Sequence, residues 1–319
     1  MSANVAAVIV TYNSACEIGA CLRALSGVGE VVVVDNASSD DTCERAEAAA
    51  PHAQLIRNNE NLGFAAAVNQ GIRATSSPLV LLLNPDAILR TPLEAMVAEC
   101  LSPQAGAACG RLTDASGQLQ AGFNVRSLPT PLMLAAEVLL LNRLWPSNPL
   151  NRRYRRLDFD PARSQQVEQP AGAFLMVRRD ALDKIGYLDE QFYPIWFEDV
   201  DLCLRLRRAG FTIRYTPGCV AEHEGGHSLR AMPLEQKHLA WYGNLLRYAA
   251  KHYSAAAFLG LRAAVYAGLF LRWSASVLSG DSRAQRRGYW IATKFVRSSP
   301  RQGLHTPVKV GNTAESRSS

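Results

Sequence analysis

Four strand-like segments alternate with helix-like patterns between residues 5 and 86. The segments at 5–10, 31–34 and 79–83 are wholly apolar, and the segment at 54–57 is shorter. Wholly apolar runs are typical of strands that are buried on both faces of a sheet. The repeated strand–helix unit predicts a mostly parallel, Rossmann-like sheet that is flanked by helices and joined by right-handed crossovers. We therefore expect an α/β fold.

Polar residues follow three of these strands at the point where each strand ends. They are Thr11-Tyr12-Asn13, Asp35-Asn36 and Asn84-Pro85-Asp86. The carboxyl ends of parallel strands share one edge of a sheet, which is where open α/β sheets bind ligands. Asn-Pro-Asp is also ordinary turn chemistry, so each group alone could be a simple loop residue. The three together predict a ligand crevice along this edge.

A helix predicted at 198–209 places one acid at the start of its apolar face. That face consists of Leu202, Cys203, Leu206 and Ala209. One turn before it lies Asp199, so its carboxylate is expected to point into the interior or into a cleft. An acid in such a position, preceded by aromatic residues, is a candidate general base. The alternative is a carboxylate that only stabilises the helix N-terminus.

The two neighbouring acids are expected to have less specific roles. Asp201 points away from the apolar face, toward Arg205 and Arg208, and is predicted to form a surface ion pair. Glu198 is expected to interact with the positive N-terminus of the helix.

His223 is a candidate metal ligand together with Asp86. It follows a short apolar segment and precedes Gly225 and Gly226, where the backbone can approach another group closely. An imidazole nitrogen and a carboxylate oxygen would suit Mn²⁺ or Mg²⁺. A single histidine is more often structural, so both interpretations stay open.

Two apolar regions with basic neighbours suggest an anionic membrane surface as a partner. Residues 132–145 are predicted to form an apolar helix, followed by a basic run at 152–156. This is either a peripheral helix with a charged end or a surface for a lipid-linked or phosphorylated partner. Residues 255–278 carry Arg262 and Arg272, which favours a helix lying in the interface over one that spans the bilayer. More basic residues follow at 283–301.

Charge and cysteine content narrow the class of protein. The 319 residues are 48% hydrophobic with a net charge of +6, which excludes an acidic or disordered chain. The basic segments are interleaved with leucine rather than with stacking aromatics, so no nucleic-acid partner is expected. Seven cysteines without a C-x-x-C pair predict reduced thiols, and no secretory signal is expected. We expect a cytoplasmic protein that is peripheral on the inner face of the cell membrane.

Six motifs occur in order: VTYN at 10–13, VDNASSD at 34–40, NLGFAAAVNQG at 61–71, LNPD at 83–86, GAF at 172–174 and FEDVDLCLR at 197–205. As a set they resemble family 2 glycosyltransferases of the rhamnosyltransferase-like branch, over roughly residues 5 to 230. The resemblance implies a GT-A fold, a nucleotide-sugar donor, a divalent metal and inversion at the anomeric carbon. It implies a domain at 1–230, with a nucleotide-binding half at 1–110 and an acceptor and catalytic half at 111–230. A helical region at 231–298, with a disordered tail at 299–319, would complete the chain.

The resemblance also implies roles for single residues. The donor site would comprise Thr11, Tyr12, Asn13, Asp35 (on the base), Asn36, Asn61, Gly63, Phe64, Asn69, Asn84, Asp86 and Gly172. Asp86 matches the last acid of the family's D-x-D metal motif, Asp199 matches the base of its E-D motif, and His223 matches a metal ligand of some members. The first acid of D-x-D is Asn84 here, so His223 or donor oxygens must complete the metal shell.

The implied reaction is metal-assisted, inverting transfer of a sugar to a hydroxyl of a glycan or lipid-linked saccharide, with Asp199 as the base. The branch favours rhamnose, and dTDP-rhamnose over a UDP-sugar. One alternative is a non-catalytic sugar-nucleotide-binding protein of polysaccharide assembly, which would not need a buried base. A nucleotidyltransferase would require a glycine-rich, lysine-bearing phosphate loop, and the segment at 11–13 is not one.

Overall fold

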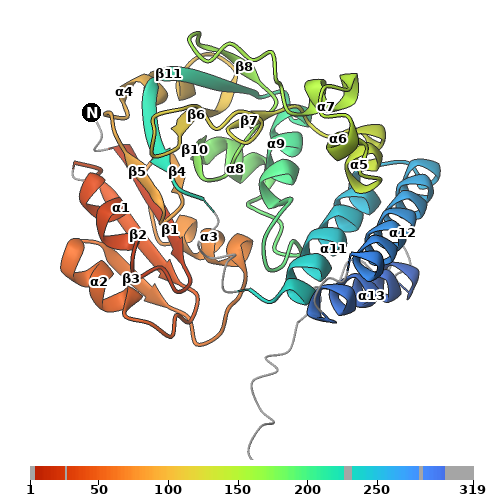
Figure 1. Ribbon diagram of the computed structural model, residues 1–319. Helices are drawn as coiled ribbons and strands as arrows, with labels where there is room; N and C mark the ends of the chain where they lie inside the picture. Colours follow the sequence, from red (N-terminus) through yellow and green to blue (C-terminus); the bar gives the residue numbers. More distant parts are fainter. Residues whose placement is uncertain (1–3, 26, 226–231, 280–282, 299–319) are drawn as a thin grey trace, which may run out of the picture.

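The computed structural model describes residues 4–25, 27–225, 232–279 and 283–298, and it contains one large sheet with a helical region beside it (Figure 1). Within this part of the chain the sheet runs in the order β3-β2-β1-β4-β10-β6-β11-β5, and β8 pairs with β11. The strands are β1 (Val5–Thr11), β2 (Glu30–Asp35), β3 (Gln54–Arg57), β4 (Leu79–Leu83), β5 (Ala87–Leu89), β6 (Ala105–Thr113), β8 (Gln165–Val167), β10 (Phe174–Arg178) and β11 (Thr212–His223). A separate pair consists of β7 (Val125–Arg126) and β9 (Gln169–Pro170).

The four predicted strands form the parallel half of this sheet, as expected. β1 lies between β2 and β4, with Thr11 opposite Asp35 and Ile9 opposite Leu83. The connecting helices are α1 (Ile18–Ala24), α2 (Thr42–Ala49) and α3 (Phe64–Arg73). The three polar strand ends therefore lie along one edge, which confirms the α/β prediction and brings the candidate donor residues into one region.

Both faces of the sheet are covered, which explains the wholly apolar strands. Alternate residues of β1 pack into two separate cores, with Ile9 on one side and Val8 on the other. The first core is closed by α1, α2 and α4 (Glu94–Cys100), and the second by α3, α8 (Arg179–Ile185) and α9 (Glu198–Arg208).

The segment after β4 forms a short strand before its helix. That helix, α4, begins at Glu94. Before it, β5 pairs antiparallel with β11, and the Thr91 hydroxyl accepts a hydrogen bond from the Val220 backbone N–H (2.8 Å). This short strand has consequences for the site because it sets His223 opposite Ala87, next to Asp86.

A helical region packs beside the sheet (Figure 1). It consists of α5 (Pro131–Val138), α6 (Leu141–Leu144), α7 (Pro149–Tyr154), α11 (Leu234–His252), α12 (Ala255–Leu278) and α13 (Arg283–Ser298). The continuous helix predicted at 132–145 is wrong, because Leu140 adopts a left-handed conformation (φ 66°) that separates α5 from α6. α12 packs against α5, and together with α11 and α13 it encloses a third apolar core.

One described helix, α12, is long and apolar enough to cross a membrane by length and composition, and 28% of its most apolar stretch is buried in the fold. The tail predicted to be disordered at 299–319 lies outside the described residues, and so do residues 226–231.

Candidate active site

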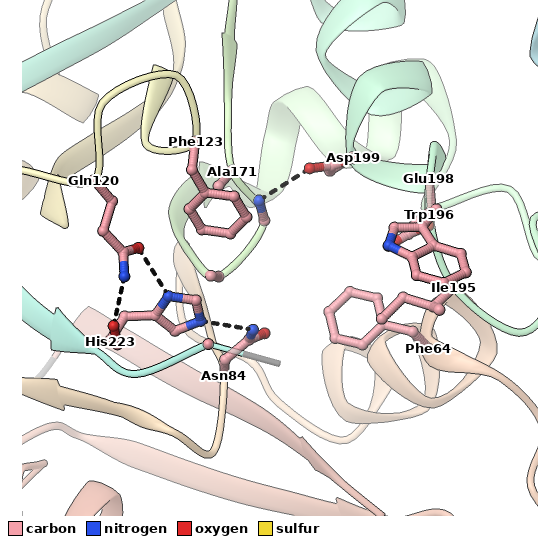
Figure 2. A pocket seen from close by; sticks show the side chains of 13 residues that line it. Phe64, Asn84, Gln120, Phe123, Ala171, Ile195, Trp196, Glu198, Asp199 and His223 are labelled. Carbon is pink, nitrogen blue, oxygen red and sulfur yellow. Dashed lines mark hydrogen bonds between the residues drawn. The ribbon is translucent and has the colours of Figure 1, made fainter. Parts of the chain in front are cut away.

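Asp86 and His223 meet beyond the end of β4. Figure 2 shows His223 with its neighbours Asn84 and Gln120. The ladder between β5 and β11 places His223 Nε2 3.4 Å from Asp86 Oδ1. The Asn84 amide nitrogen lies 3.4 Å from the same Nε2. Both ionisable side chains are largely buried, at 4% exposure for His223 and 8% for Asp86. The proximity predicted for these two residues is therefore present.

Gln120 orients the imidazole of His223. Its Nε2 donates to the His223 carbonyl (2.6 Å), so its Oε1 is left to accept from Nδ1 (3.0 Å). Phe123 stacks on the other side of the histidine ring, with centroids 5.3 Å apart. A neutral ring whose Nδ1 donates presents the Nε2 lone pair toward Asp86, which is the arrangement of a metal-binding histidine. Sequence reasoning missed both Gln120 and Phe123, because neither belongs to a motif.

The ligand atoms of Asp86 and His223 fit a site for a divalent metal. Asp86 Oδ1 and His223 Nε2 lie close enough for one divalent cation to take both as ligands, since a carboxylate oxygen and an imidazole lone pair are both metal-binding groups. Within the described ranges, no group of three or more His, Cys, Asp or Glu side chains is placed to hold a metal. If a divalent ion binds here, Asp86 and His223 would be two of its ligands, and donor phosphate oxygens would supply others, as is common for Mg²⁺ or Mn²⁺.

Asp199 lies at the first turn of α9, across the pocket from His223 (Figure 2). Its Oδ2 accepts from the Gly172 backbone N–H (3.2 Å) and from Gln169 Nε2 (3.3 Å), and its Oδ1 accepts from the Val200 N–H (2.8 Å). Burial raises the pKa of Asp199, although these backbone hydrogen bonds oppose the rise. The carboxylate is thus fixed in direction and made more basic than an exposed aspartate, as expected of a general base.

An unusual backbone turn delivers this acid. Trp196 and Phe197, directly before α9, both have positive φ angles (81° and 74°). Such conformations are costly for bulky residues and are concentrated at functional sites. The turn points Trp196 and the start of α9 toward the same pocket.

Glu198 is buried rather than placed at the exposed end of the helix. Only 4% of it is exposed, it lines the pocket, and its Oε2 has no hydrogen-bond partner among the described residues. Burial, and then the neighbouring Asp199 charge, raise the pKa of Glu198 well above its usual value. Glu198 therefore keeps its proton to a higher pH than an exposed glutamate does.

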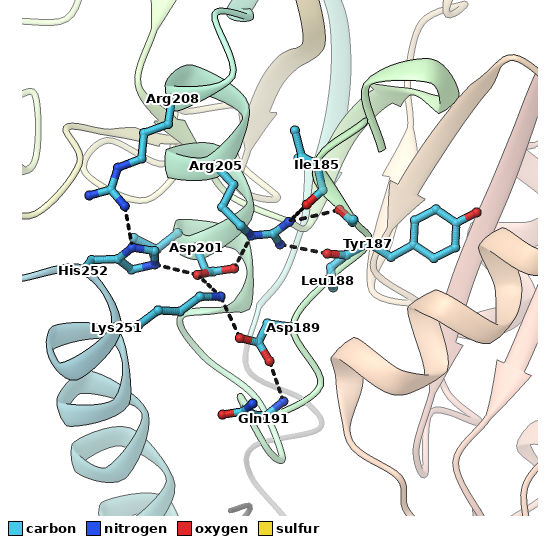
Figure 3. A network of polar contacts seen from close by, with 12 residues as sticks. Ile185, Tyr187, Leu188, Asp189, Gln191, Asp201, Arg205, Arg208, Lys251 and His252 are labelled. Atoms are coloured by element: carbon cyan, nitrogen blue, oxygen red, sulfur yellow. Dashed lines mark hydrogen bonds and ion pairs between the residues drawn. The ribbon is translucent and has the colours of Figure 1, made fainter. Parts of the chain in front are cut away.

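The ion pair predicted between Asp201 and Arg205 is present, but its predicted position on the surface is wrong. Asp201 is fully buried and contacts Arg205 (2.6 Å), Lys251 (2.7 Å) and His252 (2.6 Å), as Figure 3 shows. Arg208 instead contacts the ring of His252. The error arose because the pattern within α9 alone cannot show that α11 packs over this side of the helix.

A pocket of about 480 Å³ lies between His223 and Asp199 (Figure 2). Asn84 and His223 line one side, Glu198 and Asp199 line the other, and Gly172 lies between them. Phe64, at the start of α3, contributes an apolar wall.

The residues predicted to bind the nucleotide form a hydrogen-bonded group where β1 and β2 end. Thr11 donates to Asp35 Oδ1 (2.8 Å), and Asp35 also accepts from the Ser38 N–H and hydroxyl (2.9 and 2.5 Å). The Asn13 N–H in turn donates to Ser38 (2.8 Å). Tyr12 lies between Thr11 and Asn13 and is partly exposed.

The residues predicted to form the nucleotide–sugar side of the site contact the segment before α9. Asn36 donates to the Gly63 carbonyl (3.1 Å), and the Gly63 N–H donates to the Asn61 side chain (2.9 Å). Tyr193 donates to the Asn61 carbonyl (3.3 Å) and lies so close to Gly63 that a Cβ there would be 2.8 Å from its ring.

Asn69 is hydrogen-bonded within the protein. It is buried on α3, where it exchanges two hydrogen bonds with the Leu188 backbone (2.9 and 3.0 Å) and donates to Glu190 (2.9 Å). These contacts link α3 to residues 188–190.

Known proteins resemble this chain in sequence and in fold. A family model described as "Glycosyltransferase like family 2" matches residues 3–244. The chain belongs to glycosyltransferase family 2. It is 29% identical over 273 residues to the N-acetylglucosaminyl-diphospho-decaprenol L-rhamnosyltransferase of Mycobacterium tuberculosis (strain ATCC 25618 / H37Rv), covering 76% of this chain and 87% of that protein.

A second relative of this glycosyltransferase is the low-salt glycan biosynthesis hexosyltransferase Agl10 of Haloferax volcanii, 27% identical over 211 residues and covering 65% of this chain and 62% of that protein. Among solved structures, the mannosyltransferase PcManGT from Pyrobaculum calidifontis, in complex with GDP-Man and Mn²⁺, superposes with a TM-score of 0.53 at 16% identity and covers 92% of this chain and 87% of that chain. GalNAc-T7 with UDP, GalNAc and Mn²⁺ superposes with a TM-score of 0.56 at 12% identity, covering 92% and 55%.

These likenesses confirm the predicted GT-A fold. The family and its rhamnosyltransferase relatives establish the chain as a rhamnosyltransferase-like enzyme that transfers sugar from a nucleotide donor.

Proposed function

We propose that this glycosyltransferase moves rhamnose from dTDP-rhamnose to a hydroxyl of a lipid-linked saccharide, with inversion and with Asp199 as the general base. The curated relative at 29% identity, whose name specifies an L-rhamnosyl group and a diphospho-decaprenol acceptor, supports the sugar and the acceptor class.

The position of Asp199 is the observation that carries the proposal. An acceptor hydroxyl has a pKa far above neutral, so it must lose its proton as it attacks. The Asp199 carboxylate lines the pocket, is held by three N–H donors, and has a pKa raised by burial. It can therefore accept that proton without moving.

The leaving group on the opposite side of the pocket is a nucleoside diphosphate. Asp86 and His223 would hold a divalent ion there, with donor oxygens as further ligands. When bound, such an ion would neutralise the charge that develops on the leaving diphosphate. Gln120 keeps the His223 Nε2 lone pair directed toward Asp86.

We further propose that the enzyme works at the inner face of the cell membrane. The length and composition of α12, and exposed apolar side chains on it such as Phe270 (54%) and Leu278 (88%), support contact with lipid.

A donor screen tests the proposal directly. The purified enzyme is incubated with dTDP-, UDP- and GDP-sugars, Mn²⁺ and N-acetylglucosaminyl-diphospho-decanol, and release of nucleoside diphosphate is measured together with the saccharide product. We expect dTDP-rhamnose to be used best. Turnover of a UDP- or GDP-sugar alone would overturn the donor assignment, and binding of donors without any transfer would favour a non-catalytic binding protein.

The variant Asp199→Asn separates chemistry from binding. It should bind the donor as the wild type does but transfer sugar at least about 100-fold more slowly, since a positioned base contributes roughly 10²- to 10⁴-fold. A normal rate in this variant would exclude Asp199 as the base.

A further inference from the structure

A second pocket lies against Asp199 from another direction. It is smaller than the first, at about 270 Å³, and shares Phe123, Ala171, Trp196 and Asp199 with it. The second pocket alone reaches Arg126 on β7, Glu137 on α5 and Trp241 on α11. Asp199 therefore stands where the two pockets meet (Figure 2 shows it from the side of the first pocket).

The two pockets lie on different sides of Asp199, which suits one to the donor and the other to the acceptor. The first contains Asn84 and His223, next to the group expected to hold the donor diphosphate. A general base must touch the acceptor hydroxyl while the donor stays in place. The second pocket offers such an approach to Asp199 without entering the donor side.

Arg126 gives the second pocket a cation that has no ion-pair partner among the described residues. Its Nε donates to the Gly122 carbonyl (2.6 Å), and its guanidinium lies over the rings of Phe123 and Tyr154 (5.8 and 5.9 Å to the centroids). Among the described residues, no carboxylate lies within ion-pair distance of it. Its charge nonetheless acts on Asp199, lowering a carboxyl pKa that burial raises.

The other arginine of this pocket is already engaged. Arg155 contacts Glu137 (3.4 Å) and donates to Asn151 (3.0 Å). Arg126 is therefore the group available to an anionic ligand, and a guanidinium recognises phosphate oxygens through two parallel N–H donors.

The remaining walls suit a saccharide. Trp196 and Trp241 present partly exposed rings, which offer broad apolar surfaces with a polar edge. Gln169 also lines this pocket and is only 3% exposed, yet its Oε1 has no hydrogen-bond donor among the described residues. A saccharide in the pocket brings the hydroxyl donors that this buried oxygen lacks.

We propose that the second pocket is the acceptor site and that it binds a sugar carrying a phosphate or diphosphate, with a hydroxyl at Asp199, the sugar between Trp196 and Trp241, and the phosphate on Arg126. This inference rests on the proposed function for the role of Asp199, but the recognition of phosphate by Arg126 can be tested independently of the donor.

Two sources could provide this chemistry: a soluble sugar phosphate or a lipid-linked sugar diphosphate. Exposed apolar side chains lie on and after α5, which lines the pocket, at Leu132 (68%), Leu144 (82%) and Trp145 (54%). They favour the lipid-linked form, since a polyprenyl chain leaving the phosphate could cover them.

Binding titrations of Arg126→Gln test the phosphate contact without requiring turnover. Tryptophan fluorescence is followed as the enzyme is titrated with N-acetylglucosamine 1-phosphate, N-acetylglucosaminyl-diphospho-decanol or decyl N-acetylglucosaminide. Loss of a charge-assisted phosphate contact should weaken binding of the two phosphorylated probes about 10- to 100-fold and leave the neutral glycoside unchanged. Tighter wild-type binding of the diphospho-decanol than of the soluble phosphate would assign the lipid-linked source, and the reverse order would assign the soluble one.

The control variant is Arg163→Gln, which removes a charge from an arginine whose side chain is 83% exposed. It should bind all three probes as the wild type does. The proposal would be overturned if Arg126→Gln weakened binding of the charged and the neutral probes equally. It would also be overturned if the wild type bound the phosphorylated and the neutral probes with the same Kd.

Donor binding distinguishes this proposal from the proposed function. The Kd for dTDP-rhamnose should be the same in Arg126→Gln and in the wild type. A weakened donor Kd with unchanged acceptor binding would place Arg126 on the donor and overturn the acceptor site. If no donor is turned over but Arg126 still selects phosphorylated sugars, the proposed function fails while the anion-binding site stands.

Discussion

The backbone of Gly172 lies directly against Asp199, because glycine has no side chain to separate them. The Gly172 N–H donates to Asp199 Oδ2 (3.2 Å), and a Cβ on Gly172 would lie 3.2 Å from the Asp199 Cβ. Gly172→Ala should therefore displace the candidate base by a few tenths of an ångström or more. Because small misplacements of reacting groups are costly, kcat should fall about 10- to 100-fold while the donor Kd changes little.

Gly260→Ala is the matched control for this substitution. Gly260 lies in α12, and nothing lies within 4 Å of a Cβ added there. Because alanine favours a helix over glycine, this variant should keep the wild-type kcat and gain up to about 1 kcal/mol in unfolding free energy. Wild-type kcat in Gly172→Ala would show that the carboxylate position is not critical.

The pH dependence of kcat/KM should report the raised pKa of Asp199. The base acts only when ionised, so kcat/KM should rise with pH through an acidic limb that lies above the usual aspartate value of about 3.9. Arg126→Gln removes a charge that lowers this pKa and should move the limb to higher pH. Profiles measured from about pH 5 to pH 9 on the neutral glycoside acceptor would check both, and a limb that stays in place in Arg126→Gln would contradict the coupling.

Glu198 should make the enzyme less stable as the pH rises. Its folded-state pKa is raised by burial, so the folded protein holds a proton that the unfolded chain releases, and stability is lost as pH increases through the folded-state value. The glutamine in Glu198→Gln cannot ionise. This variant should therefore have a higher Tm than the wild type, and the difference should be larger at about pH 8.5 than at about pH 5. A pH-independent difference in Tm would indicate a packing effect instead.

The parallel half of the fold could be predicted because its information is local. Each apolar strand, polar strand end and helix cap lies within a few consecutive residues, and parallel pairing then brings Thr11, Asp35 and Asn84 to one edge. The position of Asp199 was predictable for the same reason, from the spacing of apolar residues on a single helix.

The remaining site depends on contacts between distant segments. His223 meets Asp86 because β5 pairs with β11, and Gln120 orients His223 from a loop that no motif marks. The burial of Asp201 depends on α11 packing over α9. No periodicity within one helix or strand carries such information.

Asp86 and His223 should act together on donor binding. If both hold the divalent ion, Asp86→Asn and His223→Gln should each weaken Mn²⁺-dependent binding of dTDP by about tenfold or more, as measured by calorimetry with and without Mn²⁺. Gln120→Ala removes the group that orients the imidazole and should have a smaller effect in the same direction. Titrations that do not depend on Mn²⁺ in the wild type would contradict this role.

Asp201 should stabilise the packing of α9 against α11. Although burial raises its pKa, hydrogen bonds from His252 and Lys251 and the charge of Arg205 lower it to about 2. Removing one partner of a buried charged group leaves the others uncompensated, so Asp201→Asn should reduce the unfolding free energy by about 3–5 kcal/mol near neutral pH.

This stabilisation should be lost in acid. The folded-state pKa of Asp201 lies below the unfolded value of about 3.9, so its contribution is present above that value and disappears as the pH falls toward 2. Urea unfolding at pH 7 and pH 3 should therefore show a smaller effect of Asp201→Asn at the lower pH. Asp41→Asn, which breaks an exposed pair with Arg45, should leave the unfolding free energy unchanged at both. An equal loss for Asp201→Asn at pH 7 and pH 3 would mean that shape rather than charge holds the two helices together.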